Sequence, residues 1–211
     1  MCIRDSNILG GDTVRTPGPM VWTVTIIGEV PKGTAVMRSG AKVGDVVGVT
    51  NYVGYAATGL GALSYNLVGY DMTKVGHQRP EPQIELGQKL RQLGIHSMND
   101  ISDGLGSELN EIATASNVSI VFEEQAIPLH EETYELAKHL QTNPVDYALY
   151  GGEDFQLVFT APKSLLSELE KLAGITLIGE VLSGPPRVQM VTSDKTIKTV
   201  EAKGYNHFHE G

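Results

Sequence analysis

The feature that most constrains the fold is a helix that begins beside a cluster of acidic and small residues. Apolar residues recur at helical spacing at Leu105, Leu109, Ile112 and Ala113. The spacing predicts a helix that begins just after Asp103, with Asp103 as its N-cap, because Asp is a preferred residue there. A second carboxylate, Asp100, stands in the same stretch and is not needed for capping.

The other segments alternate irregularly between strand and helix patterns. Strand patterns occur at Met20–Val30, Asp45–Thr50, Ser119–Phe122, Phe155–Phe159 and Thr176–Leu182, and a hairpin pattern at Arg187–Val200. Helical patterns occur at Gly54–Val68, Glu81–Leu93 with Gly94 as C-cap, Glu131–Leu140 and Ser164–Leu172. This mixture lacks a strict strand–helix–strand rhythm, so it favours an α+β fold over a doubly wound sheet.

Composition limits the domain count and the classes of partner. The chain has 211 residues, 41% of them hydrophobic, which suits one domain plus part of another, and we place the boundary near Pro31–Arg38. A net charge of −9 argues against nucleic acid as the main partner. No run approaches the roughly 18 apolar residues of a membrane helix, so no membrane partner is expected. The single cysteine, Cys2, excludes an intramolecular disulfide and agrees with a cytoplasmic location.

Carboxylates recur beside glycine or small hydroxyl residues. They are Asp12, Asp100, Asp103, Glu153 and Asp154. Such positions let the backbone approach a ligand, and carboxylates bind hard cations that in turn hold phosphates. Each segment also has an ordinary explanation as a turn, a helix cap or a tight entry to a strand.

Other nucleotide and hydrolase motifs give little support. Arg38 stands beside a glycine turn and is either a solvated surface group or a phosphate clamp. The glycine-rich stretch 54–61 has neither the Gly-Lys-Ser/Thr of a P-loop nor a dinucleotide fingerprint. No histidine pair suggests zinc, and no Gly-x-Ser-x-Gly suggests a serine hydrolase.

The order of the motifs is more specific than any one of them. Gly-Gly-Asp-Thr, Arg-Ser-Gly-Ala-Lys-x-Gly-Asp, Asp-x-Ser-Asp-Gly-Leu, Gly-Gly-Glu-Asp-Phe-x-Leu and Gly-Tyr-x-His-Phe follow one another from about Asn7 to Phe208. This series resembles the bacterial thiamine-monophosphate kinases. The wider superfamily, with aminoimidazole ribonucleotide synthetase and selenophosphate synthetase, shares the architecture but not the Gly204–Phe208 ending. The resemblance therefore implies the C-terminal domain of the aminoimidazole ribonucleotide synthetase-like fold, plus a strand remnant of the N-terminal domain.

The resemblance implies transfer of the γ-phosphoryl group of ATP to the phosphate of thiamine monophosphate, in line and with Mg²⁺. No side chain is expected to form a covalent intermediate, because such transfer depends on positioning and metal electrostatics. The resemblance implies that the aromatic face of Tyr205 contacts the cationic thiazolium ring. A tyrosine that packs on the core is an equally good explanation for this residue. The implied contacts are ATP at Gly11, Asp12, Arg38 and Ser102, Mg²⁺ at Asp12, Asp100 and Asp103, and thiamine phosphate at Glu153 and Tyr205.

The chain also departs from the family pattern. The acidic motifs that precede Gly-Gly-Asp-Thr in the family do not occur, so we expect residues 1–6 to be a spurious leader. Residues 7–37 are expected to be a remnant of the N-terminal ATP-binding and dimerisation domain, and 38–211 the C-terminal domain. Such a fragment is expected to have little activity alone, while the complete protein is expected to be a homodimer. Asn99 stands where the family usually has an apolar residue, and Tyr55 where it usually has a small one.

Two alternatives stay open from the sequence. One is a related ATP-dependent enzyme of the same superfamily with another acceptor, which binding tests involving Glu153 and Tyr205 would distinguish. The other is a non-catalytic binding module derived from the kinase.

Overall fold

The computed structural model describes residues 9–203 of the chain. The chain divides into two compact units, residues 1–31 and 32–211, and each is treated by itself. Residues 9–31 of the first unit contain no helix or strand. The contacts and distances described below are those within the second unit.

The strand expected at Met20–Val30 is not formed. Trp22, Val24 and Ile26 alternate as a strand would, but their side chains are 78–84% exposed. A strand is stable only when a neighbour satisfies its backbone groups, and within residues 9–203 the sheet pairs only strands of the second unit. The alternating pattern was therefore insufficient, because it does not reveal whether a pairing partner is present.

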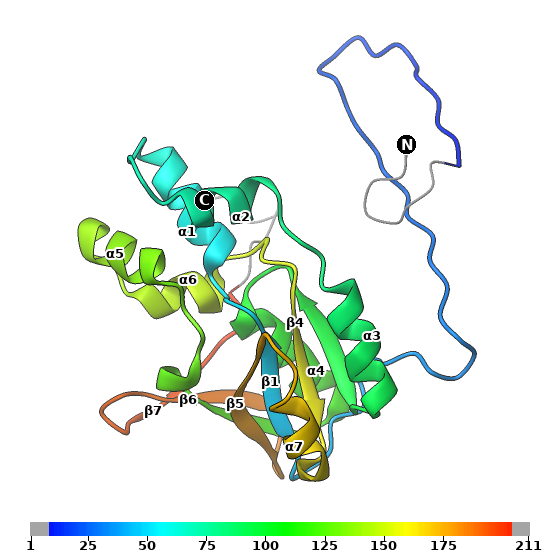
Figure 1. The fold of residues 1–211 in the computed structure, drawn as a ribbon, viewed down its shortest axis with the longest axis vertical. Helices are drawn as coiled ribbons and strands as arrows, with labels where there is room; N and C mark the ends of the chain where they lie inside the picture. Colours follow the sequence, from blue (N-terminus) through cyan, green and yellow to red (C-terminus); the bar gives the residue numbers. More distant parts are fainter. Residues whose placement is uncertain (1–8, 204–211) are drawn as a thin grey trace. The chain divides into compact units, whose positions relative to one another are not determined.

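The second unit is built on a sheet in the order β2-β4-β1-β5-β3-β6-β7 (Figure 1). The strands are β1 (Val46–Thr50), β2 (Ser97–Ile101), β3 (Ser119–Glu123), β4 (Gln156–Ala161), β5 (Ile175–Leu182), β6 (Arg187–Val191) and β7 (Ile197–Thr199). Neighbouring strands run antiparallel except β3 and β6, which are parallel. The predicted mixed α+β class and the C-terminal hairpin are confirmed.

Helices cover both faces of this sheet, so it has two hydrophobic cores. On one face α4 (Leu105–Ser116) packs with Val47, Val49 and Val158. On the other, α3 (Ile84–Leu93) and α7 (Leu166–Leu169) pack with Val46 and Phe159. Successive strand residues thus alternate between the two cores, as the strand repeat requires.

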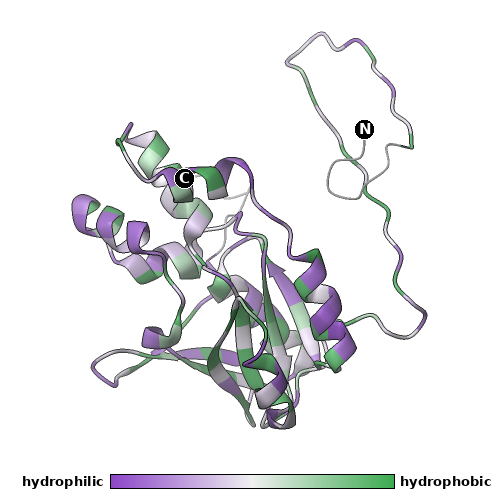
Figure 2. Cartoon of the chain, in the orientation of Figure 1, coloured by the Kyte–Doolittle hydropathy of each residue, from purple (hydrophilic) through white to green (hydrophobic). Residues whose placement is uncertain are grey.

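Four helices gather beyond one end of β1 and β4 in Figure 1. They are α1 (Tyr55–Ser64), α2 (Asp71–Gln78), α5 (Glu131–Leu140) and α6 (Pro144–Tyr150), and they contact one another. Short 3₁₀ turns occur at Glu124–Ala126 and Lys163–Leu165. Figure 2 shows hydrophobic residues concentrated along the strands and hydrophilic residues on the outer sides of α3 and α5.

The helix expected after Asp103 is confirmed, but its cap is not. It begins at Leu105 with Gly104 as N-cap, and no side chain caps it, so the expectation that Asp103 is the N-cap was wrong. Gly104 has φ 98°, a conformation that L-residues rarely adopt, and this turn moves the helix start one residue further on.

Some of the remaining helices and strands were predicted correctly from the sequence, and others were missed. The α5 prediction matches the structure, and Gly94 is the left-handed C-cap of α3 as expected. Three elements, β2, α2 and α6, were missed. The β2 sequence, Ser-Met-Asn-Asp-Ile, has no strong strand signal of its own and is a strand because it pairs with β4.

Gly48 gives a direct test of the packing at the centre of the sheet. A Cβ at Gly48 would lie 2.5 Å from Phe159 Cζ, and Phe159 is fully buried. Overpacking of this kind costs roughly 1–3 kcal/mol, so Gly48→Ala should lower the urea midpoint correspondingly. Gly28→Ala, at a position with no atom within 4 Å, is the matched control. An unchanged midpoint for Gly48→Ala would contradict the packing.

Candidate functional site

The turn between β2 and α4 carries two of the predicted site residues, Ser102 and Asp103. A Cβ at the next residue, Gly104, would lie 2.6 Å from the Leu149 carbonyl oxygen, so the close approach to α6 requires glycine. Ser102 Oγ and the Asp103 backbone N–H both donate to Glu108 Oε1, at 3.4 and 3.3 Å. The first turn of α4 thus holds the loop in front of it.

The loop between α6 and β4 carries Glu153 and lies against that turn. The Glu153 N–H donates to the Ser102 carbonyl at 2.8 Å, and the Phe155 N–H donates to the Ile101 carbonyl at 2.9 Å. A Cβ at Gly152 would lie 2.2 Å from the Ser102 carbonyl oxygen, so only glycine allows this approach. These bonds continue the β2–β4 pairing beyond both strands and bring the two acidic loops together.

These loops form one wall of a cavity of about 780 Å³, called here the acidic cleft. Ser102, Asp103 and residues 151–153 contribute to it. Helices α1 and α6 supply much of the remaining lining, including Tyr147 and Tyr150. The structure therefore brings the adjacent residues Ser102 and Asp103 together with Glu153, which lies about fifty positions later in the sequence.

The other predicted site residues are placed differently. Asp100 is exposed on β2 and lines a neighbouring cavity of about 340 Å³ with Met98 and Phe155. Gly11 and Asp12 are exposed in the first unit, where Asp12 Oδ1 accepts a hydrogen bond from the backbone of the next residue at 2.8 Å. Tyr205 lies outside the described residues.

Arg38 is linked to the cleft through Asn99. Its Nε donates to Asn99 Oδ1 at 3.0 Å, and its Nη1 pairs with Glu111 Oε2 at 3.1 Å. Asn99 is buried, and its amide also donates to Glu108. The polar residue that departs from the family pattern at position 99 thus connects Arg38 to the carboxylate that holds the Ser102–Asp103 turn.

Glu108 is a buried acid that sequence reasoning missed. It is 3% exposed, and burial raises the pKa of its carboxyl to about 7. The hydrogen bond from Asp103 N–H lowers this pKa, while the charges of Glu111, Asp100 and Asp103 raise it further. A signal was present, because Glu108 stands three residues after Leu105 and four before Ile112, on the apolar face of α4.

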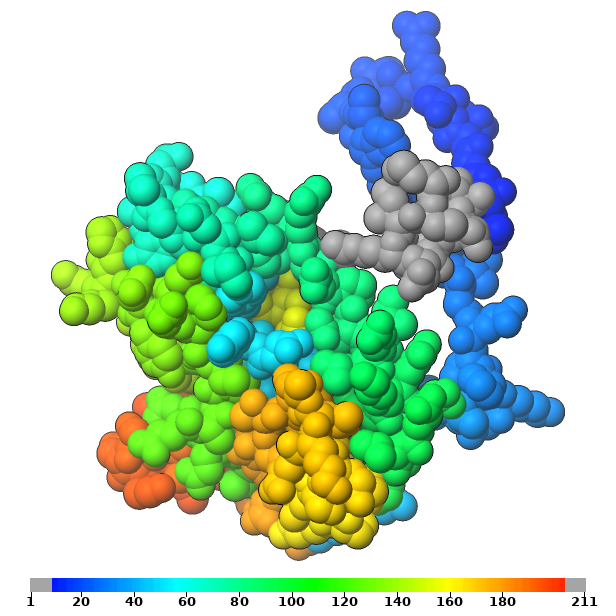
Figure 3. Space-filling view, in the orientation of Figure 1, coloured from blue at the N-terminus to red at the C-terminus, as the bar shows by residue number. Residues whose placement is uncertain are grey.

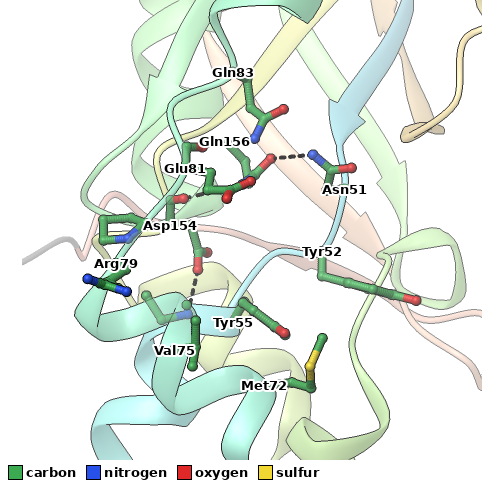
Figure 4. Close-up of a pocket in the computed structure, with 13 residues that line it drawn as sticks. Asn51, Tyr52, Tyr55, Met72, Val75, Arg79, Glu81, Gln83, Asp154 and Gln156 are labelled. Atoms are coloured by element: carbon green, nitrogen blue, oxygen red, sulfur yellow. Dashed lines mark hydrogen bonds between the residues drawn. The ribbon is translucent and has the colours of Figure 1, made fainter. Parts of the chain in front are cut away.

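Asp154 is a second buried acid, and its carboxylate is directed at the start of α1 (Figure 4). It is 4% exposed and accepts hydrogen bonds from the backbone N–H of Gly54 at 2.6 Å and of Ala56 at 2.8 Å. Burial raises the pKa of this carboxyl to about 7, although these backbone hydrogen bonds lower it. Helix α1 has no side-chain cap of its own, so Asp154 caps it across 100 residues.

Asp154 also lines a second cavity, of about 590 Å³, called here the tyrosine pocket. In Figure 3 it opens between the cyan residues near 55 and the green residues near 80, with the start of β4 at its floor. Tyr55, which departs from the family pattern, is the first residue of α1. Its ring stacks on Tyr52 and lies over Gly76, where a Cβ would be 2.3 Å away.

Some of the carboxylates around the acidic cleft are of the kind that binds Mg²⁺. Within residues 9–203 no group of three or more His, Cys, Asp or Glu side chains is arranged to hold a metal ion. Protein sites for Mg²⁺ commonly supply only one or two carboxylates, and phosphates and water complete the octahedron. Asp103 lines the acidic cleft and Asp100 the neighbouring cavity, and both are exposed, so each can offer one carboxylate to such a donor set.

In the described part of the chain, no helix is long and apolar enough to cross a membrane.

The raised pKa of Glu108 predicts how stability depends on pH in metal-free buffer. Between its ordinary value of 4.5 and about 7, the folded state binds more protons than the unfolded state, so stability falls as pH rises through this window. Glu108→Gln should reduce that fall, measured by urea unfolding at about pH 5 and about pH 8. Asp154, whose pKa is also raised, should account for part of what remains. Glu135→Gln, at an exposed residue of α5, is the matched control, and an equal fall in wild type and Glu108→Gln would refute the prediction.

The chain is similar to a known domain family and to known proteins. Residues 42–191 match the family model described as AIR synthase related protein, C-terminal domain. The thiamine-monophosphate kinase of Bacillus subtilis (strain 168) is 39% identical over 96% of this chain, and that of Escherichia coli (strain K12) is 35% identical over 97%. The chain spans 64% of the length of each of these relatives.

Solved structures give the same fold. AaThiL complexed with AMPPCP and TMP has a TM-score of 0.71 and 34% identity, covering 82% of this chain and 54% of that one. The thiamine-monophosphate kinase from Stenotrophomonas maltophilia K279a has a TM-score of 0.70 and 29% identity, covering 82% and 55%. With the family match over residues 42–191, these comparisons show that the chain belongs to the AIR synthase related protein family through its C-terminal domain.

Proposed function

We propose that this chain carries a large part of the active site of an ATP-dependent thiamine-monophosphate kinase. The observation that carries the proposal is the convergence of Ser102, Asp103 and Glu153 on one wall of the acidic cleft. Support comes from the relatives named thiamine-monophosphate kinase and from AaThiL, which was solved with AMPPCP and TMP. The reaction would transfer the γ-phosphoryl group of ATP to thiamine monophosphate and yield thiamine diphosphate.

The nucleotide would meet the start of α4. Free backbone N–H groups and the positive end of the helix dipole favour phosphate at such a terminus. Ser102 Oγ holds Glu108 only at 3.4 Å, so its hydroxyl can exchange that bond for a phosphate oxygen. Arg38, whose side chain is 55% exposed, would clamp a phosphate as its fork geometry permits. Gly11 and Asp12 complete the proposed ATP contacts.

Asp100 and Asp103 would hold Mg²⁺, and the resemblance alone proposes the same role for Asp12. When bound, Mg²⁺ neutralises charge on the two phosphates that must approach each other. The protein's own contribution is to keep these carboxylates fixed, and the Glu108 contacts to Ser102 and Asp103 do this on the side of α4. No general base is required, because the acceptor phosphate already carries negative charge at neutral pH.

Glu153 would bind the thiamine phosphate. Its backbone is anchored to Ser102, while its side chain lines the cleft and is exposed there. A carboxylate at this place suits the cationic thiazolium ring of the substrate. Tyr205 would contribute a second contact through its aromatic face.

Glu153→Gln tests the acceptor. Loss of a charged contact should weaken thiamine monophosphate binding about tenfold, while binding of Mg·AMPPCP changes less than about twofold. Isothermal titration of both ligands to the purified chain measures this, with Glu135→Gln as control. If thiamine monophosphate fails to bind wild type while another phosphorylated acceptor binds, the alternative superfamily enzyme is the correct assignment.

Asp103→Asn tests the metal side. Mg·AMPPCP affinity of this chain, and thiamine diphosphate formation by the longest available form of the protein, followed by chromatography, should both fall by about tenfold or more, because one charge-bearing ligand is lost. Raising the Mg²⁺ concentration should partly restore both. An identical Mg²⁺ dependence in wild type and Asp103→Asn would remove Asp103 from the metal site. Asp71→Asn, an exposed acid on α2, is the matched control.

We further propose that the enzyme works as a homodimer in the cytoplasm. The relatives that support the function extend beyond the region matched here, so the oligomeric state is best measured on the longest available form of the protein. Light scattering would give a mass of two chains, and a monomer would contradict this part of the proposal.

A further inference from the structure

A buried carboxylate, Asp154, lies in the wall between the acidic cleft and the tyrosine pocket. Helix α1 contributes Ala57 and Gly61 to the acidic cleft and Tyr55 and Ala56 to the tyrosine pocket. The loop before β4 behaves likewise, because Glu153 faces the first cavity and the adjacent Asp154 the second. Helix and loop meet at two places: Gly151 packs against Ala57, and the backbone N–H groups of Gly54 and Ala56 donate to Asp154 (Figure 4).

The backbone of this loop is strained and is held by hydrogen bonds to neighbouring segments. Glu153 and Phe155 both have positive φ, 69° and 49°, which L-residues adopt only at a cost. Their N–H groups point to one side and bind the carbonyls of Ser102 and Ile101. The side chain between them points to α1, so the loop is fastened to β2 through its backbone and to α1 through one side chain.

We propose that Asp154 is a positioning residue that sets the distance between α1 and the 151–153 loop, and thereby places the Glu153 carboxylate for the thiamine phosphate. This inference rests on the proposed function for the role of Glu153, but the clamp itself does not. Asp154 does not line the acidic cleft, so it acts through Glu153 and α1 and not by contact with a ligand there.

The nucleotide side of the cleft is held by different bonds. Arg38 is fixed by Asn99 and Glu111, and the Ser102–Asp103 turn by Glu108. None of these bonds involves Asp154. Loss of the hydrogen bonds to Asp154 should therefore affect the two ligands differently. The affinity for thiamine monophosphate should fall, and the affinity for the nucleotide should not. A general loss of folded protein would instead weaken both in the same proportion.

The test uses the whole chain with Asp154→Asn, which keeps the shape but offers a neutral group with only one acceptor oxygen. Titration calorimetry with thiamine monophosphate and with Mg·AMPPCP gives the two affinities, and amide hydrogen exchange by NMR reports on Gly54 and Ala56. We expect about a tenfold loss for thiamine monophosphate, less than about a twofold change for Mg·AMPPCP, and faster exchange at both amides. Asp71→Asn is the control for the chemical change.

Asp154→Glu guards against a variant that fails to fold. It retains the charge but is one methylene longer, so the cap is kept while the loop is displaced. Thiamine monophosphate binding should fall again with Mg·AMPPCP binding preserved. Unchanged amide exchange in Asp154→Asn, or equal losses for both ligands in both variants, would overturn the proposal. If wild type binds no thiamine monophosphate but the two amides respond as expected, the proposed function fails and the clamp between α1 and the loop stands.

Discussion

The antiparallel pairing of β2 with β4 is the interaction on which the site depends. Its register places Asp100 opposite Leu157 and Ile101 opposite Gln156. The pairing then continues past the strand ends through the bonds from Glu153 and Phe155 to Ser102 and Ile101. A shift of one residue would turn every side chain of the shifted strand to the opposite face, and Ser102, Asp103 and Glu153 would no longer meet.

Two buried carboxyls stabilise this arrangement at an electrostatic cost. Removing a charge from water is unfavourable unless hydrogen bonds compensate for it. Glu108 accepts bonds from Asn99 and the Ser102–Asp103 turn, and Asp154 accepts bonds from the start of α1. Burial nevertheless raises the pKa of both carboxyls to about 7, so below that pH each acid is mainly protonated in the folded protein.

These two acids lie outside the lining of the cleft and support different parts of its wall. Glu108 organises the turn and, through Asn99, the arginine proposed to meet the nucleotide. Asp154 organises α1 and the loop proposed to meet the thiamine phosphate. If the cleft brings two phosphates together, as proposed, such rigid support would favour the reaction, because phosphoryl transfer relies on positioning.

The mixed fold, the helices with clear periodicity and the acidic motifs whose order indicated the family could all be predicted from the amino-acid sequence. This was possible because helical spacing, glycine C-caps and glycine–acid turns are local properties, as at Leu105–Ile112 and Gly94. Only the tertiary structure decided that Met20–Val30 is not a strand and that Ser97–Ile101 is one, since strands depend on their neighbours. It also decided that Glu108 and Asp154 are buried supports beside the motif residues, because burial and hydrogen-bond partners from distant segments exist only once the chain has folded.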